Sequence, residues 1–518
     1  MKRFSRHAFA GFVANGVLFP ALAITPACSA REPAGPGAAI HPSAVNAGQI
    51  TIAPAPGRAR PPFAFSDEDG ALLDEVQRGA FNFFWTALSP GGEMVRDRTG
   101  SDVVSVAGVG FQLAAYAVGV ERGWVSREEA GSRCERVLRA LIDEPSNKKA
   151  GLYYHFLNGD ATPRRVGREL VVSTVDSALL FAGAIVAGEY FGGGVRTAAE
   201  EMLAAADWAF FAEHGGGPHE RGFVSLGWRP TRDDDPTGDG ALLPYYWIDS
   251  GDEHRLVTFL GVCAPTESHR LEPSRYYALR RQLGVHEPDG YVSWFPYSGA
   301  LFTAFFAHCW IDYARLGVDD PGRWGMTHRA RVDWWENSRR LTVLHRDRAI
   351  ANPLGLPTLG ANAWGMSACD GPEGYLVPGH FPETVEMIGA EAGRDFSTYR
   401  PSEDWGGGTV PPYAAASSIV FEPALALEAM RHYRSLGATG DGTGVWRDPE
   451  TGGFGFVDAY REAPEGLWVA SDTVAIDHGP MVVLIENART GLIWSLFMRN
   501  GAVRSGLDRL GLGVSGSP

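Results

Sequence analysis

Residues 173–190 read STVDSALLFAGAIVAGEY, a strongly apolar stretch with helical spacing and a single acid inside it. A helix that is apolar on all sides lies in the interior of a protein. Its acid, Asp176, is expensive to bury in the ionised form unless a partner or a polar cavity receives it. The stretch therefore predicts a packed helical core in which Asp176 faces either an internal ion-pair partner or a polar cleft.

Helical periodicity continues on both sides of this stretch. Between residues 72 and 84, large apolar side chains recur on one helical face. Ser126 and Glu129 have the spacing of a capping box that opens another helix. Further apolar helices are predicted at 104–120, 198–211, 253–263, 301–316, 331–345, 423–436 and 480–497, whereas strand-like alternation is short and scarce, around 222–225 and 453–457.

This number of helices bears on the fold class. About a dozen helices in a single chain suggest a toroid of helical hairpins, and we predict an all-α fold of the (α/α)6 barrel type. An irregular all-α enzyme or an α-solenoid would also be rich in helices. The sequence has no repeat of fixed period, which counts against a solenoid.

Composition and charge exclude one class of partner. The 518 residues are 45% hydrophobic and 21% charged, which is ordinary for a globular protein. The net charge of -15 and the lack of a basic stripe argue against a nucleic-acid partner. The 15 tryptophans suit stacking platforms in a cleft, although a tryptophan-rich core would explain them too.

The N-terminus has the layout of an export signal. Lys2, Arg3 and Arg6 precede an apolar stretch and then a run of small residues that contains Cys28. Two destinations remain open, a periplasmic protein or an outer-membrane lipoprotein tethered through lipidated Cys28. We predict an export signal over 1–30, a flexible Pro/Ala-rich linker over 31–62, one folded catalytic domain over 63–500 and a tail over 501–518.

Short motifs narrow the chemistry further. The remaining cysteines lack CxxC spacing, so we expect no metal site and no cofactor; disulfides and buried free thiols are both open for them, at Cys134, Cys263, Cys309 and Cys369. The sequence has no HExxH, GxSxG, GxxxxGK[ST] or EF-hand motif, which weakens metalloprotease, serine-hydrolase and nucleotide-dependent functions.

One segment places an acid next to aromatic residues. Tyr246 and Trp247 precede Glu253, which opens an apolar helix. Aromatic faces stack on sugar C–H surfaces, and an apolar wall keeps a carboxyl group protonated as a general acid. The helix dipole alone also favours an acid at this position, so a purely structural role for Glu253 is the competing interpretation.

The end of the chain repeats this combination of acids and aromatics. Asp458 is followed by Trp468 and Asp472. A pair of carboxyl groups in an aromatic cleft is what hydrolysis of a glycosidic bond needs, one as acid and one as base. Caps and ion-pair partners would leave the same pattern.

Two further segments supply candidate binding residues. His308 lies among aromatics, and Asn362, Trp364 and Asp370 share a glycine-containing segment. A single histidine in an apolar helix is more often a core residue than a ligand. We nevertheless count these four residues as candidates for substrate binding.

Taken in order, these segments resemble the bacterial glycoamylase-like domain family, which includes glycoside hydrolase family 144 and the hydrolase-like domain of cyclic β-1,2-glucan synthases. The resemblance runs from about residue 72 to 499. It rests on Val109–Phe111, Gly119–Gly123, Ser173–Ala178, Ala264–Thr266, Trp335–Ser338, Asn352–Pro353, Asn362–Asp370, Phe456–Ala459, Ile476–Pro480 and Ile485–Leu492. It implies an (α/α)6 barrel that acts on β-glucan, with β-1,2-glucan as the expected substrate.

The resemblance also implies roles for three acids. Glu253 falls at the position of the family's general acid, Asp458 at that of the base, and Asp176 matches an acid on the cleft helix. In the resulting hypothesis Asp176 and Asp370 orient sugar hydroxyls, and net inversion follows. The remaining candidates bind the sugar, through rings at Trp247, Trp364 and Trp468 and through contacts of Tyr246, His308, Asn362 and Asp472.

The sequence departs from the family pattern close to these acids. Asp252 replaces the usual Asn before the acid, His254 replaces Ala, and Ala361 replaces a Glu. Three alternatives therefore stay open: a hydrolase of another linkage, a lyase on a helical toroid, and a glycan-binding lipoprotein without activity.

Overall fold

The computed structural model describes residues 45–167, 169–212, 222–296, 298–388, 403–437 and 444–513. The predicted export signal and Cys28 lie outside these ranges. Helices dominate the described chain, as predicted. They are α1 (Asp67–Thr86), α2 (Val106–Glu121), α3 (Arg127–Asp143), α4 (Thr174–Phe191), α5 (Gly193–Ala205), α6 (Trp208–Ala212), α7 (Asp252–Cys263), α8 (Ser274–Ala278), α9 (Tyr313–Leu316), α10 (Trp334–Ala351), α11 (Pro412–Ser417), α12 (Pro423–Ser435), α13 (Ala475–Arg489), α14 (Leu492–Arg499) and α15 (Gly501–Leu510).

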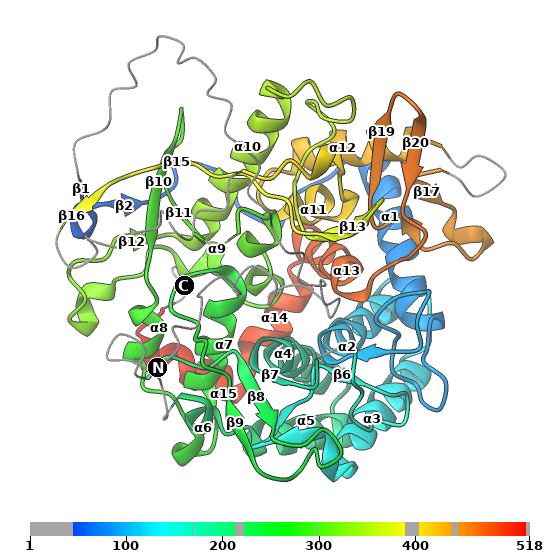
Figure 1. The fold of residues 1–518 in the computed structure, drawn as a ribbon, viewed down its shortest axis with the longest axis vertical. Coiled ribbons are helices and arrows are strands. Elements are labelled where there is room, and N and C mark those ends of the chain that lie inside the picture. The colour runs from blue at the N-terminus through cyan, green and yellow to red at the C-terminus, as the bar shows by residue number, and fades with distance from the viewer. Residues whose placement is uncertain are drawn as a thin grey trace, which may run out of the picture.

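Helices α2 and α4 lie side by side and pack closely against each other (Figure 1). Their backbones approach so closely that a Cβ on Gly183 would lie 1.9 Å from the carbonyl oxygen of Gly110. Only glycine fits at such a contact. Helix α4 is long and apolar enough to cross a membrane, yet 78% of it is buried inside the protein, so its apolar character reflects its place in the core.

The other central helices continue from this pair into a ring. Helix α2 also packs on α13, α4 packs on α7, and α13 packs on α11. Helix α7 contacts two short 3-10 segments, Leu301–Ala304 and Ala307–Cys309, and the ring of Phe305 between them lies 6.2 Å from that of Tyr413 on α11. Helices α1, α3, α5 and α12 pack on the outside of this ring.

The predicted helix at 301–316 is wrong. The segment instead forms the two 3-10 segments and the single turn of α9. The backbone N–H groups of Ala307 and His308 donate to the carboxylate of Asp252 on α7. A continuous α-helix would use these donors within itself, so the buried acid on the neighbouring helix interrupts it.

Two other predicted helices differ in their limits. The stretch at 198–211 is broken between α5 and α6 at Ala206–Asp207. The stretch at 480–497 begins five residues earlier, at Ala475, and breaks at Gly491, which adopts a left-handed conformation with φ of 70°. Because Pro480 lies near the N-terminus of α13, it was taken for the start of the helix, and Asp477 in the first turn was missed.

Short strand pairs join the helices at one end of the ring. The pairs are β3 (Val104–Ser105) with β6 (Phe156–Leu157), β4 (Lys148–Lys149) with β5 (Leu152–Tyr153), β7 (Val172–Ser173) with β8 (Gly227–Pro230) and β9 (Gly240–Leu242), β10 (Gln282–His286) with β11 (Gly290–Trp294) and β15 (Glu383–Thr384), β13 (Cys369–Gly371) with β14 (Gly374–Leu376), β17 (Trp446–Arg447) with β18 (Gly455–Phe456), and β19 (Tyr460–Ala463) with β20 (Gly466–Val469). All are antiparallel. Most of these strands have two or three residues, too few to show an alternation in the sequence, and the longest, β10 and β11, have five.

The predicted linker and tail are both part of the fold where they are described. Strand β1 (Val45–Asn46) pairs in parallel with β16 (Met387–Ile388), and β2 (Thr51–Ile52) pairs with β12 (Arg331–Val332). Ile52 is fully buried, and Arg60 forms an ion pair with Asp333. Helix α15 packs on α7. The folded domain therefore extends beyond 63–500 in both directions.

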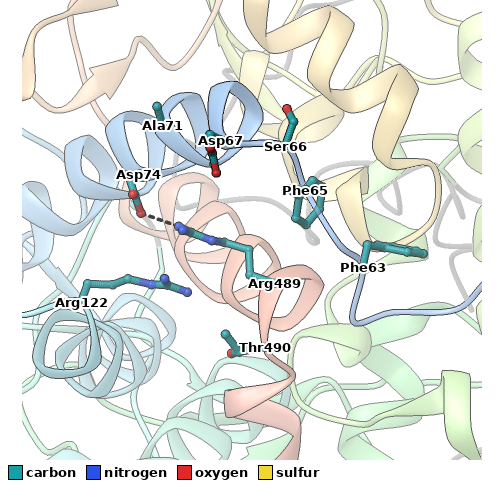
Figure 2. A pocket seen from close by; sticks show the side chains of 10 residues that line it. Phe63, Phe65, Ser66, Asp67, Ala71, Asp74, Arg122, Arg489 and Thr490 are labelled. Carbon is teal, nitrogen blue, oxygen red and sulfur yellow. Dashed lines mark hydrogen bonds and ion pairs between the residues drawn. The ribbon is translucent and has the colours of Figure 1, made fainter.

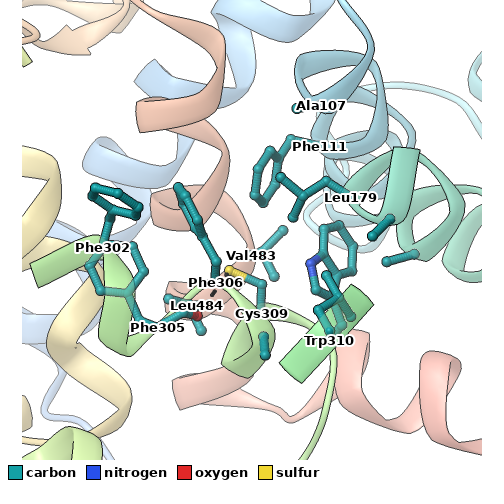
Figure 3. Packing of buried hydrophobic residues seen from close by; sticks show 14 of the residues in the cluster. Ala107, Phe111, Leu179, Phe302, Phe305, Phe306, Cys309, Trp310, Val483 and Leu484 are labelled. Carbon is teal, nitrogen blue, oxygen red and sulfur yellow. Dashed lines mark hydrogen bonds between the residues drawn. The ribbon is translucent and has the colours of Figure 1, made fainter. Parts of the chain in front are cut away.

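The core brings four distant segments together (Figure 3). Phe111 of α2 lies beside Leu179 of α4 and against Trp310, with ring centroids of Phe111 and Trp310 5.3 Å apart. Val483 of α13 lies in the same cluster. All four are almost fully buried, so this cluster holds the ring of helices together.

This packing predicts a large effect of truncating Trp310. Trp310→Ala should lower the free energy of unfolding by about 3–5 kcal/mol, because it removes a large buried side chain and leaves a cavity. Urea unfolding followed by circular dichroism measures the change. The matched control, Leu354→Ala at a 62% exposed position, should stay within about 0.5 kcal/mol of wild type. Equal effects of the two changes would contradict this account of the core.

Candidate active site

The buried acids gather at the N-terminal ends of the central helices. Asp176 lies in the first turn of α4, Asp252 and Glu253 in that of α7, and Asp477 in that of α13. Backbone N–H groups at a helix N-terminus favour the ionised form of an acid. Whether each acid is charged therefore depends on its other surroundings, which differ from one to the next.

Glu253 is the acid with the least support for a negative charge. It is 3% exposed, and its Oε1 has no hydrogen-bond partner among the described residues. Burial, followed by the charges of Asp176 and Asp252, raises its pKa well above the usual range. His254 lies 3.9 Å away, but burial lowers its pKa to about 4 and it supplies no positive charge. Glu253 therefore favours its protonated form.

Asp252, next to it in the chain, is held in the opposite state. It is fully buried and receives the guanidinium of Arg255, while Nδ1 of His308 lies 3.0 Å from its Oδ1. Burial acts to raise the pKa of Asp252, but His308 and Arg255 outweigh it and leave the pKa lowered. An ionised carboxylate thus lies beside the protonated Glu253.

Asp176 meets the polar partner that its sequence predicts. The hydroxyl of Ser173 donates to its carboxylate, and Nε2 of His155 lies 3.4 Å from its Oδ1. Burial raises the pKa of Asp176, while His155 and Ser173 act against this change. Of the two environments that the sequence left open for Asp176, the structure therefore shows the ion-pair partner, His155.

A second acidic cluster surrounds Asp458, in the loop between β18 and β19. Asp458 is 1% exposed and accepts a 2.7 Å hydrogen bond from the backbone N–H of Asp370. Burial, followed by the charge of Asp370, raises its pKa, and a hydrogen bond from Asp477 lowers it. The pKa of Asp477 is raised well above the usual range by burial and by Asp458. Asp477 therefore keeps the proton of this pair and donates a hydrogen bond to Asp458.

Arg98 organises the more open side of this cluster. Its guanidinium lies 3.0 Å from Asp370, 3.5 Å from Asp97 and 3.7 Å from Asp472. The positive charge of Arg98 acts to lower the pKa of Asp458. The negative charge of Asp97 also acts to raise the pKa of His155 and that of Asp176. Asp97 and Arg98 therefore lie between the two clusters and link them electrostatically.

The structure brings several of the predicted site residues together. Asp176 and Glu253 interact in the first cluster. Asp370, Asp458 and Asp472 gather in the second around Arg98. The half-buried ring of Trp468 on β20 packs beside them, against the small cluster of Cys369, Ala459 and Ala470.

Other predicted binding residues lie in the core. Trp247 is 4% exposed, donates from Nε1 to the hydroxyl of Thr174 and stacks on His254. Trp364 and His308 are fully buried, and Tyr246 packs in a small apolar cluster. In this structure Trp247, Trp364 and His308 therefore have no free face for a sugar. Asn362 is exposed, in the turn between Gly360 and Ala363.

Four members of the clusters were not predicted: Arg98, His155, Glu169 and Asp477. Asp477 carried a signal, since it stands in the first turn of an apolar helix, but the helix start was misplaced. His155 lies among aromatic residues and Glu169 lies in a loop. They form an ion pair in the structure, but no periodic pattern in the sequence connects the two positions. Arg98 follows Asp97 in a loop without a pattern.

Two other features bear on chemistry. The four described cysteines are buried and form no disulfide with one another. Of the two states that the sequence left open, disulfides or buried free thiols, this structure shows free thiols. In the described part of the chain, no group of three or more histidine, cysteine or acidic side chains is placed to hold a metal ion.

A cavity of about 510 Å3 lies at the other end of the same helices (Figure 2). Its lining includes Arg122, just after α2, and Arg489, at the end of α13. Arg489 is paired with Asp74, and Arg122 with Glu486, so both charges are already satisfied. The acids with raised pKa values lie at the opposite helix ends, and we place the candidate active site there.

The raised pKa of Glu253 predicts a pH-dependent gain in stability for Glu253→Gln. In the folded protein this pKa lies above its ordinary value of 4.5, so wild type loses stability as pH rises from about 4.5 through the folded-state pKa. Glutamine does not titrate. The difference in melting temperature, variant minus wild type, should therefore be lowest near pH 4 and should increase toward pH 8. Calorimetric scans across this range measure it.

The control for this experiment is Glu128→Gln, at an exposed position in α3. Its difference from wild type should stay nearly constant with pH. Parallel curves for Glu253→Gln and wild type would show that Glu253 titrates normally, and would remove the assignment of a protonated acid.

Comparison with known proteins supports a family assignment. The Glycoamylase family model, described as "Putative glucoamylase", matches residues 244–501. A crystal structure with that description from Bacteroides uniformis is 27% identical, with a TM-score of 0.69 over 86% of this chain and 98% of the other. An endo-β-1,2-glucanase from Chitinophaga pinensis, at 22% identity, shares the fold with a TM-score of 0.66 over 86% of this chain and 98% of its own.

A curated relative extends the likeness to the N-terminal part. The exo β-1,2-glucooligosaccharide sophorohydrolase of Parabacteroides distasonis is 24% identical over 473 residues, which is 85% of this chain. The match spans 58% of the length of that relative. Glu253, Asp370, Asp458 and Asp477 all fall within residues 244–501, and this part of the chain belongs to the Glycoamylase family.

Proposed function

We propose that this protein is a glycoside hydrolase that cleaves β-1,2-glucan. The observation that carries the proposal is Glu253, which is buried at a helix N-terminus and whose pKa is raised by burial and by the carboxylates of Asp176 and Asp252. A proton donor with a raised pKa and a separate base are what glycosidic hydrolysis requires. The activities of the Parabacteroides and Chitinophaga relatives support the choice of linkage.

In the proposed mechanism Glu253 donates its proton to the glycosidic oxygen. Asp458 removes a proton from water, either directly or through a sugar hydroxyl, and the configuration is inverted. Burial and the charge of Asp370 raise the pKa of Asp458 to about 7, although Arg98 and a hydrogen bond from Asp477 act to lower it. A base with a pKa near neutral pH is suited to accept a proton from water there. Direct activation of water would need the two carboxyl groups about 6.5–9.5 Å apart in the complex, whereas retention would need about 5–5.5 Å.

Substrate contacts follow from the accessible side of the site. In this proposal the partly exposed Asp370 and the buried Asp176 orient sugar hydroxyls, and the half-buried Trp468 offers a ring face for stacking. Asp472, held by the N–H of Gly100 and the hydroxyl of Thr99, completes this side. The site has more acids than cations, which suits a neutral polysaccharide better than an anionic one.

The proposed fold is an (α/α)6 barrel. Its inner helices would be α2, α4, α7, α11 and α13, with the 3-10 segments before α9 in the sixth inner position. The outer helices would be α1, α3, α5, α8, α10 and α12. The packing of α2 on α4 and α13, and of α1 and α12 outside, supports this arrangement.

A linkage panel tests the proposed function. The purified enzyme, Glu253→Gln and Asp458→Asn would be incubated with linear β-1,2-glucan, β-1,3-glucan, cellulose oligomers and soluble starch. We expect release of sugars from β-1,2-glucan alone, with both variants slower by about 10²–10⁴-fold because each lacks one proton-transferring group. The control Glu128→Gln should match wild type.

Each other result has a distinct meaning. Cleavage of a different polymer would support the proposed mechanism but show that the substrate is not β-1,2-glucan. Near-normal turnover by Glu253→Gln would remove Glu253 as the acid. Binding of an oligosaccharide without release of any product would leave a glycan-binding protein.

We also propose that the chain is exported and anchored through Cys28. The basic, apolar and small-residue segments before Cys28 support export. In cell fractionation the wild-type protein should sediment with membranes, and Cys28→Ser should move to the soluble periplasmic fraction. Wild type already in that fraction would replace anchoring by simple release, and protein in the cytoplasm would contradict export.

A further inference from the structure

The proposed mechanism leaves His155 without a role, although it lies directly beside the site. Its ring is buried, with Nδ1 2.7 Å from Oε1 of Glu169 and Nε2 3.4 Å from Oδ1 of Asp176. The ring also lies parallel to that of Phe156, with centroids 3.7 Å apart. Both ring nitrogens thus face carboxylate oxygens, and the ring cannot turn without breaking its packing.

We propose that His155 is a positioning residue that determines which carboxyl group of the neighbouring pair, Asp176 and Glu253, carries the proton. The inference rests on the proposed function, because it concerns the state of the general acid. It assigns no contact between His155 and substrate.

The argument begins with the pair itself. Two carboxyl groups that interact in a buried site do not both ionise readily, so one of them keeps a proton. The proton stays on the group whose negative charge is least stabilised. Asp176 has the hydroxyl of Ser173 and the ring of His155, whereas Oε1 of Glu253 has no hydrogen-bond partner in the described chain.

The second step concerns the charge on His155. A histidine whose two nitrogens both face carboxylates is most stable as the imidazolium, which has an N–H on each nitrogen. Burial acts to lower the pKa of His155, but Asp176 and Glu169 outweigh it and raise the pKa to about 9. His155 therefore stays charged at neutral pH, where the enzyme would act.

The third step shows that the other charged groups near Asp176 and Glu253 are already paired and do not stabilise the negative charge of Asp176. The negative charge of Asp252 is matched by Arg255 and His308, and that of Asp97 by Arg98. His155 is the cation in contact with Asp176. If it were neutral, the shared proton would divide between Asp176 and Glu253, and part of the enzyme would lack a general acid.

Substrates that differ in the leaving group test this inference. Cleavage of β-1,2-glucan needs a proton on the leaving oxygen, whereas an aryl β-1,2-glucooligosaccharide with a dinitrophenyl leaving group does not. His155→Gln keeps hydrogen-bond donors but no charge. We expect its kcat on β-1,2-glucan to fall by about 10–100-fold, part of the effect of losing an acid, with KM little changed. The activated substrate should be cleaved at near the wild-type rate.

His155→Lys provides the matched control, because it replaces one cation by another. It should retain most of the glucan activity that His155→Gln loses. Equal losses on both substrates in His155→Gln would indicate general structural damage and overturn the inference, as would normal cleavage of β-1,2-glucan.

If His155→Gln does not fold, Glu169→Gln gives a second test. Without Glu169 the pKa of His155 should fall, so glucan cleavage should be lost at a lower pH than in wild type while the activated substrate is unaffected. An unchanged pH profile would overturn the inference.

Glu253→Gln separates this inference from the proposed function. If Glu253 is the acid, its variant should also be rescued by the activated substrate. Failure of that rescue removes the proposed function. Rescue of Glu253→Gln together with a fully active His155→Gln removes only the role of His155.

Discussion

The buried carboxylate of Asp252 is the constraint that connects the fold to the site. A fully buried charge must be given partners, and Asp252 takes them from two directions. Arg255 comes from its own helix, while His308 and two backbone N–H groups come from the segment before α9. The same contacts that interrupt a helix at 301–316 therefore join α7 to the rest of the ring. They also fix a negative charge beside Glu253.

The two acidic clusters show how similar residues reach different protonation states. In the first, cations beside Asp176 and Asp252 leave Glu253 as the acid without support, and it keeps its proton. In the second, the proton stays on Asp477, while Arg98 and a backbone N–H support Asp458. An acid and a base thus arise from the placement of neighbouring charges rather than from residue type.

Sequence patterns predicted the parts of this protein that periodicity controls. Helices α1, α2, α4, α7 and α12 appear close to their expected limits because each has a continuous apolar face. The segment at 301–316 was missed because its shape depends on an acid about fifty residues earlier, which no local pattern contains. The first strands were missed as part of a linker because two-residue pairings leave no alternation.

The site was predictable in its acids and not in its aromatics or cations. An acid within an apolar helix must have a special environment, and this identified Asp176. Glu253 was a candidate because it follows aromatic residues at a helix start and because the family resemblance assigns it. A tryptophan fits equally well in a core or in a cleft, and Trp247 and Trp364 proved to be buried. Arg98 and His155 belong to loops and strand ends, and only the folded chain places them beside the acids.

The departure from the family pattern at Asp252 is explained by this network. An Asn at this position would carry no charge and would leave the guanidinium of Arg255 buried without its partner, at a cost of several kcal/mol. Asp252, Arg255 and His308 therefore form a unit in which no single member can be exchanged freely. This unit lies beside Glu253, and none of its members is among the groups that shift the pKa of Asp458. A change in the unit would therefore act on the proposed acid and leave the proposed base unaffected.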